Sequence, residues 1–307
     1  MNTRQANIIA TCISLLIGLS ACSSSNEGIP TQTVTSPTST SAVKTTPRPI
    51  SATFTPSPVP ATPTRTPLPC PDESGSVQKD VVEITNPPQE FLIYLPPCYE
   101  NSADLHFPVL YLLHGQTYTD DQWIRLGVPQ IADRLLHAGE IIPFIIVFPD
   151  DRYWNLQAGS GFGDRFINAL IPYVDENYRT LADRDHRSLG GLSRGGGWTI
   201  ELGFANPELF GALGLHSPAI FVKDGPYLEK IIKAMPEKDR PLLWLDVGDV
   251  DSELSTIITF EEKLNSNNYI HEFHFYAGSH TESYWAAHVE EYLRWYAQRW
   301  MEKTEEQ

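Results

Sequence analysis

A serine flanked by glycines is the residue in this sequence best suited to nucleophilic chemistry. Gly191-Leu192-Ser193-Arg194-Gly195 has the pattern Gly-x-Ser-x-Gly and lies between an apolar run and a run with helical apolar spacing. This pattern is typical of a sharp turn from a strand to a helix, which lifts the serine hydroxyl above a sheet. The five residues alone occur often by chance, so Ser193 is a candidate nucleophile whose weight depends on its partners.

A base and an acid must accompany the serine, because its hydroxyl reacts only after a base takes its proton and a carboxylate orients that base. Among nine histidines, His280 lies between the last expected strand and the last expected helix. Asp251 follows the preceding expected strand, and Asp249 and Glu253 compete with it for the role of acid. The order Ser193, Asp251, His280 is that of α/β-hydrolases.

Two backbone N–H groups should bind the oxyanion, one after the nucleophile and one after the third strand. These positions are Arg194 and Gln116, and Gly115 gives the second turn its freedom. We expect His114 to satisfy this loop rather than to take part in the chemistry. The acidic run 249–253 could also bind calcium, but it lacks the glycine and terminal glutamate of an EF-hand. We therefore predict neither a metal site nor a cofactor.

Aromatic residues follow the third and fourth expected strands, where they could line the rim of the site. There they could stack on an aromatic acid or a sugar, or they could fill the packing of the loops. The residues predicted at the rim are Tyr118, Trp123, Tyr153 and Trp154.

Alternating strands and helices must position these residues. Apolar runs bounded by Pro, Gly or Asp predict strands at 81–84, 91–95, 109–113, 144–148, 188–192, 212–215, 242–247 and 273–276. Helical spacing predicts helices at 129–137, 163–178, 195–205, 227–234, 254–264 and 281–301. The pattern predicts an α/β fold, a mostly parallel central sheet of about eight strands with helices on both faces. Sites in such sheets form at the carboxyl ends of the strands.

The first 69 residues read as export and tethering segments. Residues 1–21 resemble a signal peptide, and Leu19-Ser20-Ala21-Cys22 resembles the bacterial lipobox. That resemblance implies a lipid on Cys22, which would anchor the protein to the outer face of a membrane. An ordinary secretory signal is the alternative. Residues 22–69 are rich in Ser, Thr and Pro and predict a disordered linker before one domain at 70–307.

Charge and cysteines limit the function further. The chain has a net charge of −16, and its first 69 residues are net positive, so the domain is more acidic still. This excludes nucleic acid and direct docking on anionic lipid as expected partners. In an exported protein, Cys70 and Cys98 are expected to form a disulfide that fastens the start of the domain to its sheet. Two free buried thiols are the alternative.

The chain resembles the esterase D-like, or putative esterase, family of α/β-hydrolases. This family includes feruloyl and acetylxylan esterases, formylglutathione hydrolases, enterochelin esterases and mycolyltransferases. The resemblance implies Ser193 as nucleophile, Asp251 as acid and His280 as base. The family usually has Met after the serine, whereas Arg194 here could favour anionic acyl groups or pair with a nearby acid. The matching segments are 93–97, 108–115, 146–150, 170–175, 191–196 and 278–280, with Trp285.

Together these observations predict a serine esterase. It would cleave carboxylic esters through an acyl-enzyme, on an extracytoplasmic substrate that is a small molecule or is linked to a polysaccharide. Transfer of the acyl group to another hydroxyl, as in mycolyltransferases, would use the same triad. A surface-binding lipoprotein without catalysis is the alternative outside enzymes.

Overall fold

The computed structural model describes residues 73–101, 103–151, 160–221 and 225–305, all within one compact unit. Cys22, Cys70, Tyr153 and Trp154 lie outside the described residues, as do the predicted signal peptide and linker. Among the residues described, no helix is long and apolar enough to cross a membrane.

Eight strands form one sheet in the order β1-β2-β4-β3-β5-β6-β7-β8. The first two strands pair antiparallel, β2 is also antiparallel to β4, and all other neighbours are parallel. The mostly parallel sheet predicted from the sequence is therefore confirmed. The strands are β1 Ser76–Val82, β2 Gln89–Leu95, β3 Val109–Leu113, β4 Ile145–Pro149, β5 Arg187–Ser193, β6 Ala212–Pro218, β7 Leu242–Gly248 and β8 Glu272–Tyr276.

One predicted strand is displaced. The apolar run at 81–84 predicted a strand there, but β1 ends at Val82 and Ile84 is 89% exposed in the following turn. β1 is an edge strand whose first residues face solvent, so it carries no apolar run to mark its position.

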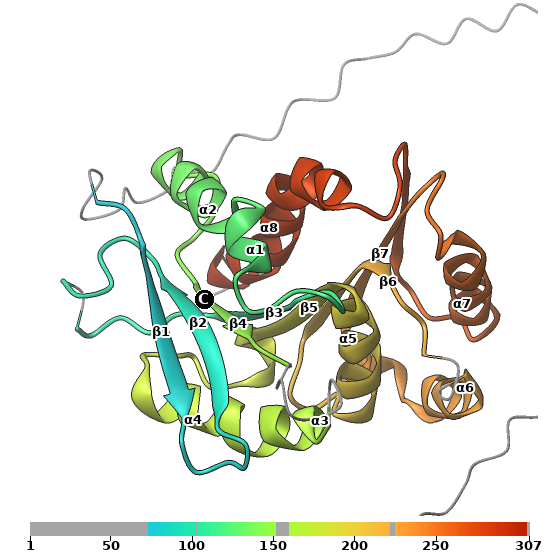
Figure 1. The fold of residues 1–307 in the computed structure, drawn as a ribbon, viewed down its shortest axis with the longest axis horizontal. Coiled ribbons are helices and arrows are strands. Elements are labelled where there is room, and N and C mark those ends of the chain that lie inside the picture. Colours follow the sequence, from blue (N-terminus) through green and yellow to red (C-terminus); the bar gives the residue numbers. More distant parts are fainter. Residues whose placement is uncertain (1–72, 102, 152–159, 222–224, 306–307) are drawn as a thin grey trace, which may run out of the picture. The chain divides into compact units, whose positions relative to one another are not determined.

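Helices cover both faces of the sheet. Figure 1 shows α1, α2 and α8 on one side and α3 to α7 on the other. Side chains alternate along β3, with Tyr111 and Leu113 packing into one apolar core and Leu110 and Leu112 into the second. The helices are α1 Gln122–Arg125, α2 Val128–His137, α3 Phe162–Arg165, α4 Ile171–Asn177, α5 Arg194–Ala205, α6 Gly225–Ala234, α7 Leu254–Ser266 and α8 Glu282–Glu305.

Two helical details differ from the prediction. The helix expected over 163–178 is divided into α3 and α4 by a π-helical turn, Phe166–Leu170. Pro172 is the second residue of α4, and a proline has no N–H with which to continue an α-helical ladder. The four-residue α1 was not predicted, because one turn is too short to show a periodic pattern.

Candidate active site

Ser193 lies at a strained turn between β5 and α5. Its backbone has φ 51° and ψ −119°, a conformation that residues with a side chain rarely adopt. The flanking glycines allow strand and helix to approach: a Cβ on Gly191 would lie 2.3 Å from the carbonyl carbon of Gly195. A Cβ on Gly195 would lie 2.2 Å from the carbonyl oxygen of Leu113 on β3. The turn therefore holds Ser193 at the carboxyl edge of the sheet, as the Gly-x-Ser-x-Gly pattern predicts.

A continuous chain of hydrogen bonds joins Ser193, His280 and Asp251. The Nε2 atom of His280 is 2.8 Å from Ser193 Oγ, and its Nδ1 is 3.0 Å from Asp251 Oδ1 and 3.1 Å from Oδ2. Since the carboxylate accepts the proton on Nδ1, the lone pair of Nε2 faces the serine hydroxyl. The imidazole can then take the serine proton.

The competing acids have other partners. Asp249 accepts a hydrogen bond from the backbone N–H of Gly278 at 2.8 Å, which fastens the loop that carries His280. Glu253 offers its own backbone N–H to Asp251 Oδ1 at 2.7 Å. Of the three acids, the structure therefore places Asp251 against the imidazole and the other two in support of the surrounding loops.

The environment of Asp251 favours its ionised form. Burial acts to raise the pKa of this carboxyl, but hydrogen bonds from His280, Ser217 and the Glu253 backbone outweigh burial and hold the pKa below its ordinary value. The His280 side chain is 22% exposed. The ring of Trp285 packs edge to face against the imidazole, with 5.0 Å between the ring centroids. The carboxylate of Asp251 is thus buried and ionised, while the imidazole of His280 stays accessible and packs against Trp285.

Ser217 is a site residue that the sequence analysis missed. Its Oγ donates a hydrogen bond to Asp251 Oδ2 at 2.5 Å and lies 3.0 Å from His280 Nδ1. The residue is buried at the end of β6 with φ 49°, in the left-handed region. A serine that follows a short apolar strand has no pattern to distinguish it, so only the fold shows its contact with the acid and the base.

The loop after β3 is held on both sides of Gly115. The N–H of Gly115 donates to Gln122 Oε1 at 2.8 Å, and its carbonyl accepts from His114 Nδ1 at 2.8 Å. A Cβ at Gly115 would lie 3.8 Å from Ser193 Cβ, so this loop borders the nucleophile. The N–H of Gln116 follows directly, and the N–H of Arg194 begins α5 beside Ser193.

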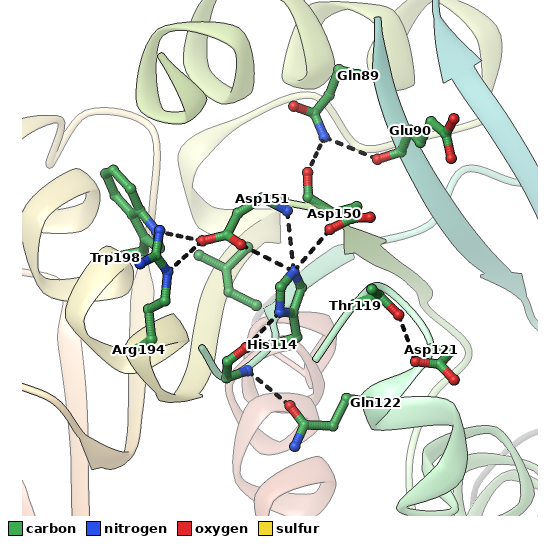
Figure 2. Close-up of polar contacts among 12 residues, drawn as sticks. Gln89, Glu90, His114, Thr119, Asp121, Gln122, Asp150, Asp151, Arg194 and Trp198 are labelled. Carbon is green, nitrogen blue, oxygen red and sulfur yellow. Dashed lines mark hydrogen bonds and ion pairs between the residues drawn. The ribbon is translucent and has the colours of Figure 1, made fainter. Parts of the chain in front are cut away.

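A buried cluster of charged groups lies behind this loop, shown in Figure 2. His114 Nε2 is 3.2 Å from Asp150 Oδ1 and 3.4 Å from Asp151 Oδ1. Burial acts to lower the pKa of His114, but the two carboxylates and the Gly115 carbonyl outweigh burial and raise it. The N–H of Asp151 also approaches Nε2, at 3.1 Å, as if Nε2 were unprotonated. We assign a proton to each ring nitrogen of His114: the Nδ1 proton is donated to the Gly115 carbonyl, and the Nε2 proton is attracted by two carboxylates more strongly than one N–H repels it.

Arg194 is paired with an acid from this cluster. Its Nε donates to Asp151 Oδ2 at 2.7 Å, and Trp198 Nε1 donates to the same oxygen at 2.9 Å. Of the two roles considered for Arg194, the described contacts correspond to pairing with a nearby acid. His114, Asp150 and Asp151 have ligand atoms within 4.8 Å of one another and could hold a metal ion. The Arg194 guanidinium already supplies positive charge to this carboxylate.

A comparison with known families matches residues 83–296 to the family described as Putative esterase. The chain belongs to this family. The match covers more than half of the chain, and the predicted family is confirmed. The enzyme class predicted from the sequence, an esterase, is that of the family.

Curated relatives of this esterase family member match part of the chain. An endo-1,4-beta-xylanase/feruloyl esterase of Xylanibacter ruminicola is 32% identical over 174 residues, which are 52% of this chain and 24% of the relative. An esterase of Mycobacterium tuberculosis is 34% identical over 141 residues, 43% of this chain and 30% of the relative. The matched segment therefore spans about a quarter to a third of the length of these relatives.

Solved structures show the same fold. A ferulic acid esterase has a TM-score of 0.65 at 25% identity, over 74% of this chain and 98% of that one. A feruloyl esterase module from Clostridium thermocellum, complexed with sinapinate, has a TM-score of 0.63 at 19% identity, over 76% and 90%. An S-formylglutathione hydrolase from Staphylococcus aureus has a TM-score of 0.59 at 17% identity, over 73% and 98%. The predicted α/β-hydrolase fold is confirmed.

The rim prediction is wrong for Trp123. This residue is 1% exposed, its Nε1 donates to the Leu113 carbonyl at 3.0 Å, and its ring packs against His216 and Tyr292. Trp123 lies in α1, beneath the end of β3, so it fills the core instead of lining the site. Tyr118 is partly exposed, with the Arg125 guanidinium 5.0 Å from its ring centre.

The structure describes only one of the two cysteines of the predicted disulfide. Cys98 is buried in the turn after β2, and Cys70 lies outside the described residues. The Cys70 to Cys98 bridge therefore stays a prediction, and so does a lipid on Cys22.

Proposed function

We propose that the protein hydrolyses carboxylic esters through an acyl-enzyme on Ser193. The hydrogen-bonded chain from Ser193 Oγ through His280 to Asp251 carries this proposal, because it is the arrangement that makes a serine nucleophilic. Its place at the carboxyl edge of the sheet, in a chain of the esterase family, supports the same reaction.

In the first half of the reaction, Ser193 Oγ bonds to the ester carbonyl carbon while its proton passes to His280 Nε2. The oxyanion that forms is bound by the N–H groups of Gln116 and Arg194. His280 then returns its proton to the leaving alcohol as the ester C–O bond breaks. In the second half, His280 takes a proton from water as the water oxygen bonds to the acyl carbon. The bond from that carbon to Ser193 Oγ then breaks, His280 returns the proton to Oγ, and the free acid leaves. Asp251 holds the imidazole and balances its charge throughout.

The substrate class we propose is an ester of an aromatic acid, such as a hydroxycinnamate, on a polysaccharide or a small molecule. Relatives whose names describe feruloyl ester cleavage support it, including the one of known structure at 25% identity. We also propose an extracytoplasmic location with a lipid on Cys22, on the strength of the lipobox-like Leu19-Ser20-Ala21-Cys22. The strongly acidic domain would then be held at the membrane by its anchor and not by its own surface.

An ester panel tests the reaction. Acetate, butyrate and feruloyl esters and a glutathione thioester are offered to the wild type, to Ser193→Ala and to Ser266→Ala, an exposed serine near the end of α7 as matched control. We expect Ser193→Ala to lose activity by at least about 10³-fold and Ser266→Ala to keep it. Activity of Ser193→Ala close to the wild type would refute the nucleophile.

Two further measurements separate the alternatives. A fluorophosphonate probe should label the folded wild type and not Ser193→Ala, whereas a protein without catalysis would not be labelled at all. With an added alcohol acceptor, hydrolysis yields free acid only, and acyl transfer yields a new ester.

A further inference from the structure

Asp151 bridges the two segments that carry the proposed oxyanion donors. The residue is 3% exposed and follows the end of β4. Its Oδ2 accepts from Arg194 Nε and Trp198 Nε1, and its Oδ1 faces His114 Nε2 at 3.4 Å. Figure 2 shows this carboxylate between His114 on one side and Arg194 and Trp198 on the other. One buried side chain therefore contacts residues of both donor segments.

His114 contributes to the direction of the Gln116 N–H through the carbonyl of Gly115. In a trans peptide the carbonyl and the following N–H point in opposite directions. The Gly115 carbonyl is drawn to His114 Nδ1 at 2.8 Å, so the Gln116 N–H must point away from the imidazole. Glycine has little conformational preference of its own, so this peptide needs an external hold. The backbone N–H of Tyr118 also donates to this carbonyl, at 3.2 Å, so loss of the His114 contact would remove the shorter of its two hydrogen bonds and weaken the hold on the peptide.

Arg194 is held at the other donor. It is the first residue of α5 and follows the strained backbone of Ser193. Its side chain is fastened by Asp151 and lies over the Trp198 ring, with 5.9 Å from the guanidinium carbon to the ring centre. The same carboxylate thus secures the side chain at the start of the helix whose first N–H is a proposed oxyanion donor.

We propose that Asp151 is a positioning residue for ester cleavage, which through His114 and Arg194 sets the orientation of both oxyanion donors. The proposal rests on the function proposed above. Asp151 contacts no reacting atom and acts through its two neighbours. Because preformed donors bind the transition state more strongly than the substrate, the effect should fall on kcat and not on KM.

The principal test is Asp151→Asn, which keeps the shape and removes the charge. We expect kcat to fall by about 10- to 100-fold with KM little changed, less than the loss of a whole donor. A trifluoromethyl ketone, which forms a tetrahedral adduct on the serine, should lose affinity by the same factor as kcat/KM. If Asp151→Asn does not fold, Trp198→Phe removes one donor from the same oxygen and should lower kcat by about fivefold.

Two variants of His114 test the peptide orientation. His114→Asn keeps a donor near the position of Nδ1, and His114→Gln places its amide near the position of Nε2. We expect the asparagine variant to retain more of kcat than the glutamine variant. Equal or greater activity of His114→Gln would overturn the proposed hold on the Gly115 carbonyl.

Other outcomes would overturn the proposal as a whole. Fluorophosphonate titration of a parallel sample gives the concentration of active sites. If Asp151→Asn has the wild-type kcat per active site and binds the ketone normally, Asp151 is structural only. Activity that disappears with EDTA and returns with Zn²⁺ or Ca²⁺ would make the cluster a metal site instead. Activity in Ser193→Ala would refute the proposed function itself, independently of the Asp151 variants.

Discussion

Two histidine–carboxylate pairs in this protein, one in the loops after β7 and β8 and one on β6 and β7, differ in what they can do. His280 and Asp251 lie at the carboxyl edge, with Nε2 turned toward Ser193. His216 and Asp246, on β6 and β7, are joined at 2.9 Å and both side chains are 0% exposed. The residue after His216 is Ser217, which contacts Asp251, so the two pairs are almost contiguous.

The difference lies in the second nitrogen of each imidazole. His216 Nε2 is 3.0 Å from the Tyr296 hydroxyl, and Asp246 also accepts from Trp244, Tyr284 and Tyr292. Every polar atom of the buried pair is occupied by protein, so it has no place for a substrate or a proton acceptor. The pair at the edge leaves one nitrogen for the nucleophile. A histidine–carboxylate pair therefore becomes a candidate for catalysis only when its outer nitrogen is accessible.

The buried pair nonetheless supports the exposed one. Asp246 Oδ1 holds the Tyr284 hydroxyl at 2.8 Å, in the first turn of α8. The Tyr284 ring packs so closely on the loop before His280 that a Cβ at Gly278 would lie 2.6 Å from it. The backbone of the base is thus anchored to the interior through one tyrosine.

The largest expected effect separates the pairs by activity. Asp251→Asn should lower kcat by about 10³- to 10⁴-fold, because the imidazole loses the carboxylate that sets its tautomer. Steady-state kinetics on a p-nitrophenyl ester, with the folded fraction measured by circular dichroism, checks this. Asp249→Asn is the matched control and should keep most of the activity. A greater loss in the control would move the role of acid to Asp249.

The second prediction separates them by stability. Asp246→Asn should destabilise the fold by about 3–5 kcal/mol, because four hydrogen-bond donors then face a neutral amide in a sealed interior. Urea unfolding measures the change. The molecules that remain folded should turn over at close to the wild-type rate. Loss of kcat without loss of stability would contradict a structural role for the buried pair.

Ser217, which links the two pairs, gives a smaller effect. Ser217→Ala should lower kcat by about tenfold, since a hydrogen bond to a charged group contributes about 1.5 kcal/mol. Ser217→Gly is the control: it also lacks the hydroxyl, but it relieves the positive φ and should be the more stable variant. We expect both variants to have the same kcat and the glycine variant to have the higher Tm. Recovery of kcat in the glycine variant would assign the effect to the backbone.

The smallest prediction concerns pH and His114, the buried histidine of the charged cluster behind the loop after β3. Its pKa is raised in the folded state, so its stabilising contribution is complete below the unfolded pKa of about 6.5 and is lost as pH rises through the folded value. The difference in unfolding free energy between wild type and His114→Asn should therefore shrink from pH 6 to pH 9. A difference that grows over this range would place the proton elsewhere in the cluster.

Local patterns predicted much of the fold. The five parallel strands β3, β4, β5, β6 and β7 carry buried apolar runs. The glycines two residues on either side of Ser193 mark a turn that only they allow. β1 was displaced, and the α3–α4 division was missed, because an exposed edge strand and a π-helical turn have no apolar period. Trp123 was misplaced because composition alone does not distinguish a core aromatic from a rim aromatic.

The sequence by itself determined the nucleophile candidate, the order of acid and base, and the strand ends on which they lie, because these follow from spacing along the chain. Only the tertiary structure decided which acid of the run 249–253 meets His280, and that Ser217 and Asp151 join the site. It also decided that the His216 side chain is fully buried while the His280 side chain is accessible to solvent. Such contacts link residues 29 or more positions apart, and their partners are chosen by how neighbouring strand ends pack.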